Sequence, residues 1–315
     1  MMDKEIFKLI KEYESIIIAR HKAPDLDAYG SQFGLYYALK EHFQNKKIYA
    51  VGDTNSLNQF QELEKVDEMI IKKSLYIITD TAVRQMLTDD SYLLADKLIV
   101  IDHHQNDTDL SPSIYYKDTE ISSASELIAR FLIRNNVKIS QNAAKPLYMG
   151  IVGDTGRFLF SSVKPETFKI AATLLETGID LNSIYNSMYF ESLQSKKMKA
   201  EYLNSFLLTK NNVGYRKNEA SFLEKYQIES KTASRMLANQ LSGIKEIPIW
   251  ANFTVDTDSG KILCELRSRK IPIVDVAKKY GGGGHLLACG ASVASWADCD
   301  LMLEDLDLLL EENHG

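Results

Sequence analysis

Carboxylate and imidazole side chains recur in this sequence where short apolar runs end. The runs SIIIA, LYIIT and LIVI are each followed within a few residues by aspartate, histidine or both, and a further aspartate lies between two glycines after MGIV. Carboxylate oxygens and imidazole nitrogens suit divalent ions such as Mn²⁺, so this pattern predicts a metal site. The residues concerned are His21, Asp25, Asp27, Asp80, Asp102, His103, His104 and Asp154.

The number of candidate ligands exceeds what one tetrahedral ion needs, and it predicts two ions that share a carboxylate. Two ions about 3.5–4 Å apart can clamp the attacking and leaving oxygens of an in-line displacement at phosphorus. They also activate a hydroxide, so that no protein nucleophile is required. The sequence agrees, because it contains no G-x-S-x-G motif, no Walker A motif and no G-x-G-x-x-G after a strand.

Taken singly, these residues have ordinary structural explanations. An aspartate at the end of a strand is most often a turn residue or a helix cap, and we interpret Asp89 and Asp107 in that way. The cluster is different, because every member would have to be a turn or cap residue at equivalent ends of neighbouring strands. Such a concentration of acidic groups and histidines indicates a metal or catalytic site.

A glycine-rich segment near the C-terminus, VAKKYGGGGHLLACG (276–290), suggests a substrate loop. Glycines let the backbone approach a ligand and present its N–H groups to an anion. A flexible loop is the competing interpretation, but the helical look of HLLACGA and the basic residues nearby favour a shaped loop. The candidate substrate-binding residues are Arg267, Arg269, Gly282, Gly283, Gly284 and His285.

The elements that would position these groups alternate between strands and helices. This alternation predicts an α/β fold, with a mostly parallel sheet flanked by helices on both faces. Ligands of such sheets bind outside the carboxyl ends of the strands, so the candidates should converge. We expect strands at 15–20, 47–52, 75–80 and 97–102, and helices at 31–43, 122–136 and 164–178.

The pattern of apolar and polar residues changes in the second half of the chain. A polar segment with helical tendency is followed by strand-like runs that turn residues interrupt, which predicts a smaller mixed α/β domain across a cleft from the first. We therefore expect a catalytic domain at 1–186, a helical linker at 187–204 and a substrate-binding domain at 205–315.

Composition places further bounds on function. The chain has 315 residues, enough for two domains, and a net charge of −6, which argues against binding long duplex nucleic acid. The N-terminus is charged and no apolar run approaches about 18 residues, so we expect no secretory signal and no membrane span. Three cysteines without C-x-x-C spacing are typical of buried thiols in the reducing cytoplasm.

Five motifs occur in order along the chain: HKAPDLDAYGS, ITD, IDHH, GIVGDTGRF and GGGGH. Together they resemble the DHH phosphoesterase superfamily over essentially the whole length. Within it, the chain length and GGGGH resemble the NrnA-type bifunctional oligoribonucleases and pAp phosphatases. The resemblance implies a DHH catalytic domain and a DHH-associated domain that holds the nucleotide. The chain departs from the family in APDLDA for NPDGDA and in ACG for AAG, and neither change removes a ligand.

The resemblance also implies a role for each candidate residue. His104 would contact the scissile phosphate, Asp102 would orient a histidine from behind the ligands, and His285 with its glycines would form a hook for substrate. Arg267 and Arg269 would bind phosphate. The implied ligands are His21 and Asp25 for one Mn²⁺, Asp27, His103 and Asp154 for the other, and Asp80 bridging both.

The implied activity is Mn²⁺-dependent hydrolysis of very short single-stranded RNA, including linear dinucleotides such as pApA, to 5′-mononucleotides, and dephosphorylation of pAp to AMP. The alternatives are a family II-like inorganic pyrophosphatase or another DHH phosphatase, and an inactive nucleotide-binding DHH module. GGGGH disfavours the pyrophosphatase, and the complete ligand set disfavours the inactive module. The physiological substrate, the cleavage polarity, the ion and the oligomeric state, a homodimer included, are left open.

Overall fold

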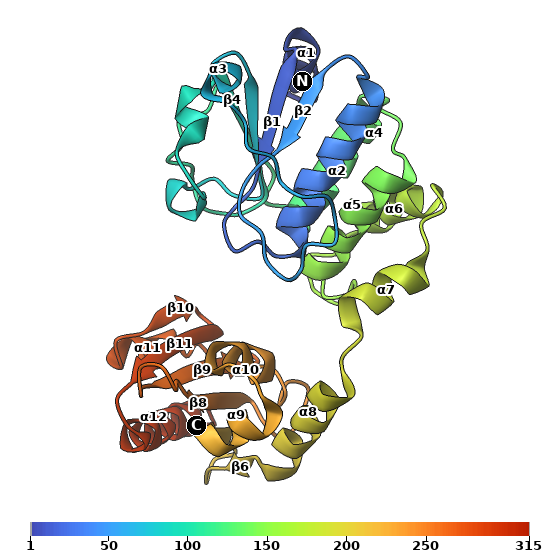
Figure 1. The fold of residues 1–315 in the computed structure, drawn as a ribbon. Coiled ribbons are helices and arrows are strands. Elements are labelled where there is room, and N and C mark those ends of the chain that lie inside the picture. Colours follow the sequence, from blue (N-terminus) through green and yellow to red (C-terminus); the bar gives the residue numbers. More distant parts are fainter. Residues whose placement is uncertain (1, 315) are drawn as a thin grey trace. The chain divides into compact units, whose positions relative to one another are not determined.

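Residues 2–314 are described by the computed structural model in Figure 1, in which the chain divides into two units. The first unit is Met1–Phe190 and the second is Glu191–Gly315. The predicted linker at 187–204 covers the end of α7 (Leu181–Tyr189) and most of α8 (Leu193–Ser205). The domain limits at 186 and 205 stay a prediction.

The apolar runs of the first unit form a parallel sheet, as the sequence predicts. The sheet has five strands in the order β2-β1-β3-β4-β5, and every neighbouring pair is parallel. Isoleucine and valine fill the central strands because branched side chains fit a pleated surface that is covered on both sides. The strands are β1 (Ser15–Ala19), β2 (Lys47–Ala50), β3 (Leu75–Thr79), β4 (Lys97–Asp102) and β5 (Ile114–Lys117).

The two faces of this sheet are covered unequally. Long helices pack on the face that contains Ile16 and Ile18, whereas the face that contains Ile17 is covered by one short helix, two 3₁₀ turns and loops. All three predicted helices are present, as α2, α4 and α6. The helices are α1 (Met2–Glu12), α2 (Leu26–His42), α3 (Glu68–Ile71), α4 (Ala124–Arg134), α5 (Gln141–Asp154) and α6 (Pro165–Leu175), and the 3₁₀ turns are Arg84–Met86 and Ser91–Leu94.

Glycines allow α2 and α5 to pack very closely. A Cβ atom on Gly30 would lie 2.6 Å from the Pro146 carbonyl oxygen. A Cβ atom on Gly150 would lie 2.0 Å from Ser125 Oγ and 2.8 Å from Asp27 Oδ1. The absence of these side chains therefore brings the start of α2, the start of α4 and the body of α5 together at one point.

The second unit is built on a mixed sheet with strand order β10-β11-β9-β8-β7-β6. Only β7 and β8 pair in parallel. Helices α9 (Ala220–Tyr226) and α10 (Ser230–Leu237) cover one face, and α11 (Val274–Lys279) and α12 (Trp296–His314) cover the other. The strands are β6 (Leu207–Leu208), β7 (Gly214–Asn218), β8 (Ile249–Val255), β9 (Ile262–Ser268), β10 (Gly283–His285) and β11 (Ala288–Val293).

One expectation for the second unit is wrong. The segment HLLACGA does not begin a helix but forms the hairpin of β10 and β11, in which Gly284 pairs with Cys289. Gly284 has a φ of +134°, which glycine adopts readily and other residues avoid, so the backbone favours the hairpin. All three cysteines are buried free thiols, as predicted. Among residues 2–314, no helix combines the length and the apolar character that a membrane crossing requires.

Candidate metal centre

The carboxyl ends of β1, β3 and β4 meet at one edge of the parallel sheet, where the predicted ligands lie. These strands are neighbours, and each is followed directly or within two residues by a predicted ligand. Asp27 lies in the first turn of α2 and Asp154 ends α5, so the two helices add carboxylates to the same edge. The groups that could hold an ion are His21, Asp25 and Asp80; Asp27, His103 and Asp154; and Asp80, His103 and His104.

The first group forms around His21. Its Nε2 atom lies 3.4 Å from Asp80 Oδ2 and 3.8 Å from Asp25 Oδ1. The Nδ1 atom of the same ring lies 2.8 Å from the Lys22 carbonyl oxygen and donates to it, which leaves Nε2 free as a ligand. Asp25 also caps α2, because its Oδ1 accepts from two backbone N–H groups in the first turn. The cap holds this carboxylate in place.

The second group forms around His103. Its Nε2 atom lies 3.3 Å from Asp154 Oδ2, 3.4 Å from Asp80 Oδ1 and 3.7 Å from Asp27 Oδ2. Asp80 therefore directs one oxygen to each group. It follows β3 in a left-handed conformation, with a φ of +61°, which aspartate tolerates better than most residues. This arrangement is what a bridging carboxylate requires.

Asp27 is buried and accepts hydrogen bonds from the start of α4. The N–H groups of Ala124 and Ser125 lie 2.6 and 2.8 Å from its two oxygens, where a helix end favours negative charge. The pKa of Asp27 is nevertheless raised well above its usual range, first by burial and then by the charges of Asp80 and Asp154. The carboxylates of Asp27, Asp80 and Asp154 therefore repel one another, and a bound cation would relieve this repulsion.

The donor atoms fit a divalent ion. Asp80 Oδ1 and His103 Nε2 are both buried, and neither has a hydrogen-bond partner among residues 2–314. Such orphaned atoms destabilise a fold unless a ligand satisfies them. Ligand bonds of about 2.0–2.2 Å place two donors of one ion roughly 3.0–3.5 Å apart, close to the spacings found here. Burial would lower the pKa of His21, but the carboxylates of Asp25 and Asp80 raise it to about 10.

Asp102 and His104 form a separate pair beside the ligands. Asp102 is fully buried, and its Oδ1 lies 2.7 Å from His104 Nδ1 and accepts the backbone N–H of His103 at 3.0 Å. The hydrogen bond between the Asp102 carboxylate and the His104 ring is the first cause of the raised pKa of His104. The His104 side chain is 48% exposed, so its other nitrogen is accessible. An imidazole held in this way, with its pKa raised, suits contact with an anionic phosphate.

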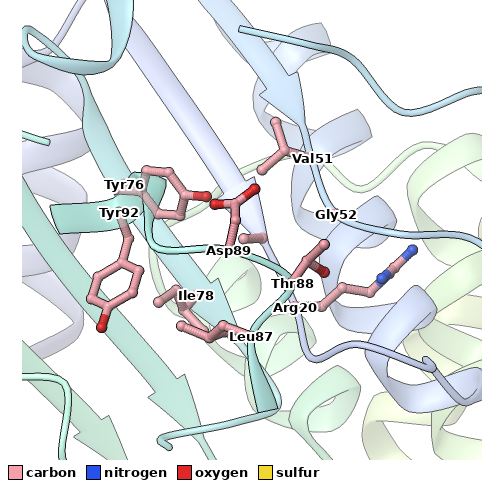
Figure 2. Close-up of a pocket in the computed structure, with 10 residues that line it drawn as sticks. Arg20, Val51, Gly52, Tyr76, Ile78, Leu87, Thr88, Asp89 and Tyr92 are labelled. Carbon is pink, nitrogen blue, oxygen red and sulfur yellow. The ribbon is translucent and has the colours of Figure 1, made fainter. Parts of the chain in front are cut away.

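A buried arginine, Arg20, lies beside the loop that carries the first ligands and was not predicted from the sequence. The Arg20 side chain is fully buried, and its guanidinium donates to the Asp53 carbonyl and lies 3.3 Å from the Asp53 carboxylate and 4.4 Å from the centre of the Tyr29 ring. Figure 2 shows Arg20 beside Gly52 and Thr88 at the edge of a small pocket. A charged residue that ends the buried run SIIIAR was the available signal, because buried charges need partners.

Asp53 transmits this interaction to the loop that carries the first ligands. Its second carboxylate oxygen accepts the N–H of Ala23, 2.9 Å away, and Ala23 has a φ of +50°. Arg20 also donates to the His21 carbonyl oxygen at 3.3 Å. The pair therefore fixes the start and the middle of the loop between His21 and Asp25.

The predicted hook residues share one face of the second sheet. His285 pairs with Ala288, which pairs in turn with Arg267. Directly paired residues point to the same face, so the His285 and Arg267 side chains lie on one side. His285 is exposed, and no protein hydrogen bond occupies its ring among the described residues.

The glycines of the hook serve different purposes. A Cβ atom on Gly282 would lie 2.1 Å from the Gly290 carbonyl oxygen, and one on Gly284 would lie 2.8 Å from Cys289 Cα, so the hairpin itself requires both glycines. A Cβ atom on Gly283 would meet nothing within 4 Å. Packing therefore does not require a glycine at position 283. The open space beside Gly283 leaves room for a ligand.

Arg269 is placed differently from Arg267. Its guanidinium donates to the backbone carbonyls of Ile244, Lys245 and Ile247, the last two at 3.3 and 3.2 Å. These bonds hold the loop before β8. The predicted phosphate-binding role of Arg269 stays a prediction.

Comparison with known proteins places both units in one family. Residues 15–151 match the N-terminal domain of the DHH family, and residues 220–312 match the DHHA1 domain. A Bacillus subtilis protein named bifunctional oligoribonuclease and PAP phosphatase NrnA is 35% identical over 99% of this chain and 100% of its own length. The chain belongs to the DHH family. The resemblance drawn from its motifs is confirmed.

A further relative and a solved structure are similar to this chain over nearly its whole length. A Streptococcus mutans protein named probable bifunctional oligoribonuclease and PAP phosphatase NrnA is 35% identical over 98% of this chain and 99% of its own length. The crystal structure of an exopolyphosphatase-related protein from Bacteroides fragilis is 26% identical, with a TM-score of 0.85 over 98% of this chain and 97% of that one. DHH phosphoesterases are metal-dependent, and this chain has acidic and histidine groups that could hold metal.

Proposed function

We propose that this protein hydrolyses very short 5′-phosphorylated single-stranded RNA, including linear dinucleotides such as pApA, to 5′-mononucleotides, and that it removes the 3′-phosphate of pAp. The observation that carries the proposal is the pair of ligand groups joined through the two oxygens of Asp80. Full-length relatives named oligoribonuclease and PAP phosphatase support the same substrate class. The net charge of −6 favours short ligands over long duplexes.

We assign two Mn²⁺ ions to the centre, one to each ligand group, with Asp80 shared. When bound, the ions supply charge neutralisation and activation of the attacking water. His104 would hold the scissile phosphate, and Asp102 would keep the His104 ring oriented. Arg267 and His285 would bind the nucleotide from the second unit. The buried free thiols support a cytoplasmic location for this activity.

A substrate panel tests this proposal. The full-length protein with Mn²⁺ is incubated with pAp, a labelled dinucleotide, a longer oligoribonucleotide and pyrophosphate. We expect rapid cleavage of pAp and the dinucleotide and slow cleavage of the longer chain. Cleavage of pyrophosphate alone would contradict the proposal.

Two substitutions test the assigned roles. Asp80→Ala should abolish hydrolysis because it removes a ligand from both groups, whereas the control Asp107→Ala removes a fully exposed carboxylate and should have no effect. His285→Ala should mainly raise KM for the dinucleotide. Normal turnover by Asp80→Ala would refute the bridging role, and an unchanged KM for His285→Ala would refute the hook.

A further inference from the structure

A pocket of about 330 Å³ lies in the second unit, between α10 and the strands β9 and β11. Its volume is within the range of about 300–1,000 Å³ that is usual for small-ligand sites. None of its lining residues belongs to the GGGGH segment. Its lining includes Lys231, Ser234, Arg235, Leu263, Glu265 and Gly290.

One wall of the pocket is basic. Lys231, Ser234 and Arg235 are spaced i, i+3, i+4 on α10 and therefore share one face of that helix. Lys231 and Arg235 are exposed, and among residues 2–314 neither side chain forms an ion pair or a hydrogen bond. Two cations without protein partners over one pocket indicate an anionic ligand.

Ser234 gives an independent indication of a ligand. It is 1% exposed, and its Oγ atom has no hydrogen-bond partner among the described residues. A buried hydroxyl without a partner destabilises the fold. A polar ligand in the pocket would satisfy this hydroxyl, whereas packing alone would favour alanine.

The floor of the pocket adjoins the predicted hook. Glu265 pairs with Gly290 on β11, and Gly290 pairs with Gly283 on β10, so these three residues share a face. Arg267 is two residues further along β9 on the same face, about 7 Å away along the strand. Arg267 binds Glu265 at 3.0 Å, which balances the negative charge of that carboxylate. A ligand at the hook could therefore extend into the pocket.

We propose that this pocket, the α10 subsite, binds one nucleotide of the substrate. The phosphate lies between Lys231 and Arg235, and Ser234 donates a hydrogen bond to it. Glu265 accepts from a ribose hydroxyl or a base amino group. The inference rests on the proposed function, and it adds residues of α10 to the substrate-binding surface.

Binding of 5′-AMP to the full-length protein tests the α10 subsite without relying on activity. Calorimetry is done in EDTA, so that the metal centre cannot hold the phosphate. We expect wild type to bind AMP and the double variant Lys231→Ala/Arg235→Ala to bind it at least tenfold more weakly. The control Lys245→Ala/Lys261→Ala removes two exposed charges of the same unit outside the pocket and should match wild type. No binding by wild type, or equal affinity in the Lys231→Ala/Arg235→Ala variant, would overturn the inference.

Ser234→Ala separates binding from folding. The variant should be as stable as wild type or more stable, because it removes an unsatisfied hydroxyl, yet it should bind AMP about fivefold more weakly. Unchanged AMP affinity would overturn the role of Ser234. Hydrolysis of pApA by wild type is measured alongside. Failure of wild type to cleave pApA would refute the proposed function, whereas the AMP titration alone tests the α10 subsite.

Discussion

Gly150→Ala tests whether the metal centre depends on the close approach of α5 to Asp27. The new Cβ atom would lie 2.0 Å from Ser125 Oγ and 2.8 Å from Asp27 Oδ1, so both groups must move. Overpacking costs about 1–3 kcal/mol, and weakening the Ser125 N–H bond to the carboxylate costs about 1.5–3 kcal/mol. Against this, alanine favours the helix by about 1 kcal/mol. We expect a net destabilisation of roughly 1.5–5 kcal/mol.

The same displacement should weaken metal binding, because Asp27 would no longer face His103. Urea unfolding measures the free energy, and equilibrium dialysis measures Mn²⁺ affinity. Gly153→Ala is the matched control on the same helix: its nearest neighbour is Leu26 Cβ at 3.1 Å, which needs to shift by only a few tenths of an ångström. Equal stability and equal Mn²⁺ affinity in Gly150→Ala and Gly153→Ala would refute this role of Gly150.

Three further outcomes are expected. Asp53→Ala should destabilise the protein by about 1–3 kcal/mol, because it removes acceptors from Arg20 and Ala23, and should lower Mn²⁺-dependent hydrolysis more than tenfold; unchanged melting and turnover would contradict the positioning role. Burial acts to raise the pKa of Asp118, but its hydrogen bond and ion pair with Arg130 outweigh burial and lower that pKa. The resulting stability is present above pH about 3.9 and is lost as pH falls through the lower folded-state value. Asp118→Asn should therefore be less stable than wild type at pH 7, and the difference should shrink as pH falls below about 3.9; a constant difference would argue against the pair. Chelation by EDTA should abolish hydrolysis and lower Tm, and Mn²⁺ should restore both; activity that survives chelation would exclude a metal role.

Strand ends could be predicted from the sequence because buried parallel strands are continuous apolar runs. His21, Asp80 and His103 follow such runs, so their convergence required only the strand order. Asp154 was predicted as a metal ligand because its carboxylate lies between two glycines after an apolar run, although the residue in fact ends a helix. That helix, α5, was not predicted, because Pro146 and two glycines lower its helical tendency and close packing on α2 overrides it.

Features that depend on distant residues could not be predicted. Arg20 and Asp53 are 33 positions apart and meet only in the folded chain. The hairpin of β10 and β11 looked helical because Leu286 and Leu287 resemble helix residues, whereas backbone contact at Gly284 decides its form. The α10 subsite joins a helix and two strands that no local pattern connects.

Titration of the metal-free protein with Mn²⁺, with pApA hydrolysis followed at each addition, tests the central claim most directly. The shared position of Asp80 predicts that hydrolysis rises as the second equivalent of Mn²⁺ binds and that AMP is the product. Full activity with one equivalent, or intact pApA at saturating Mn²⁺, would contradict the account.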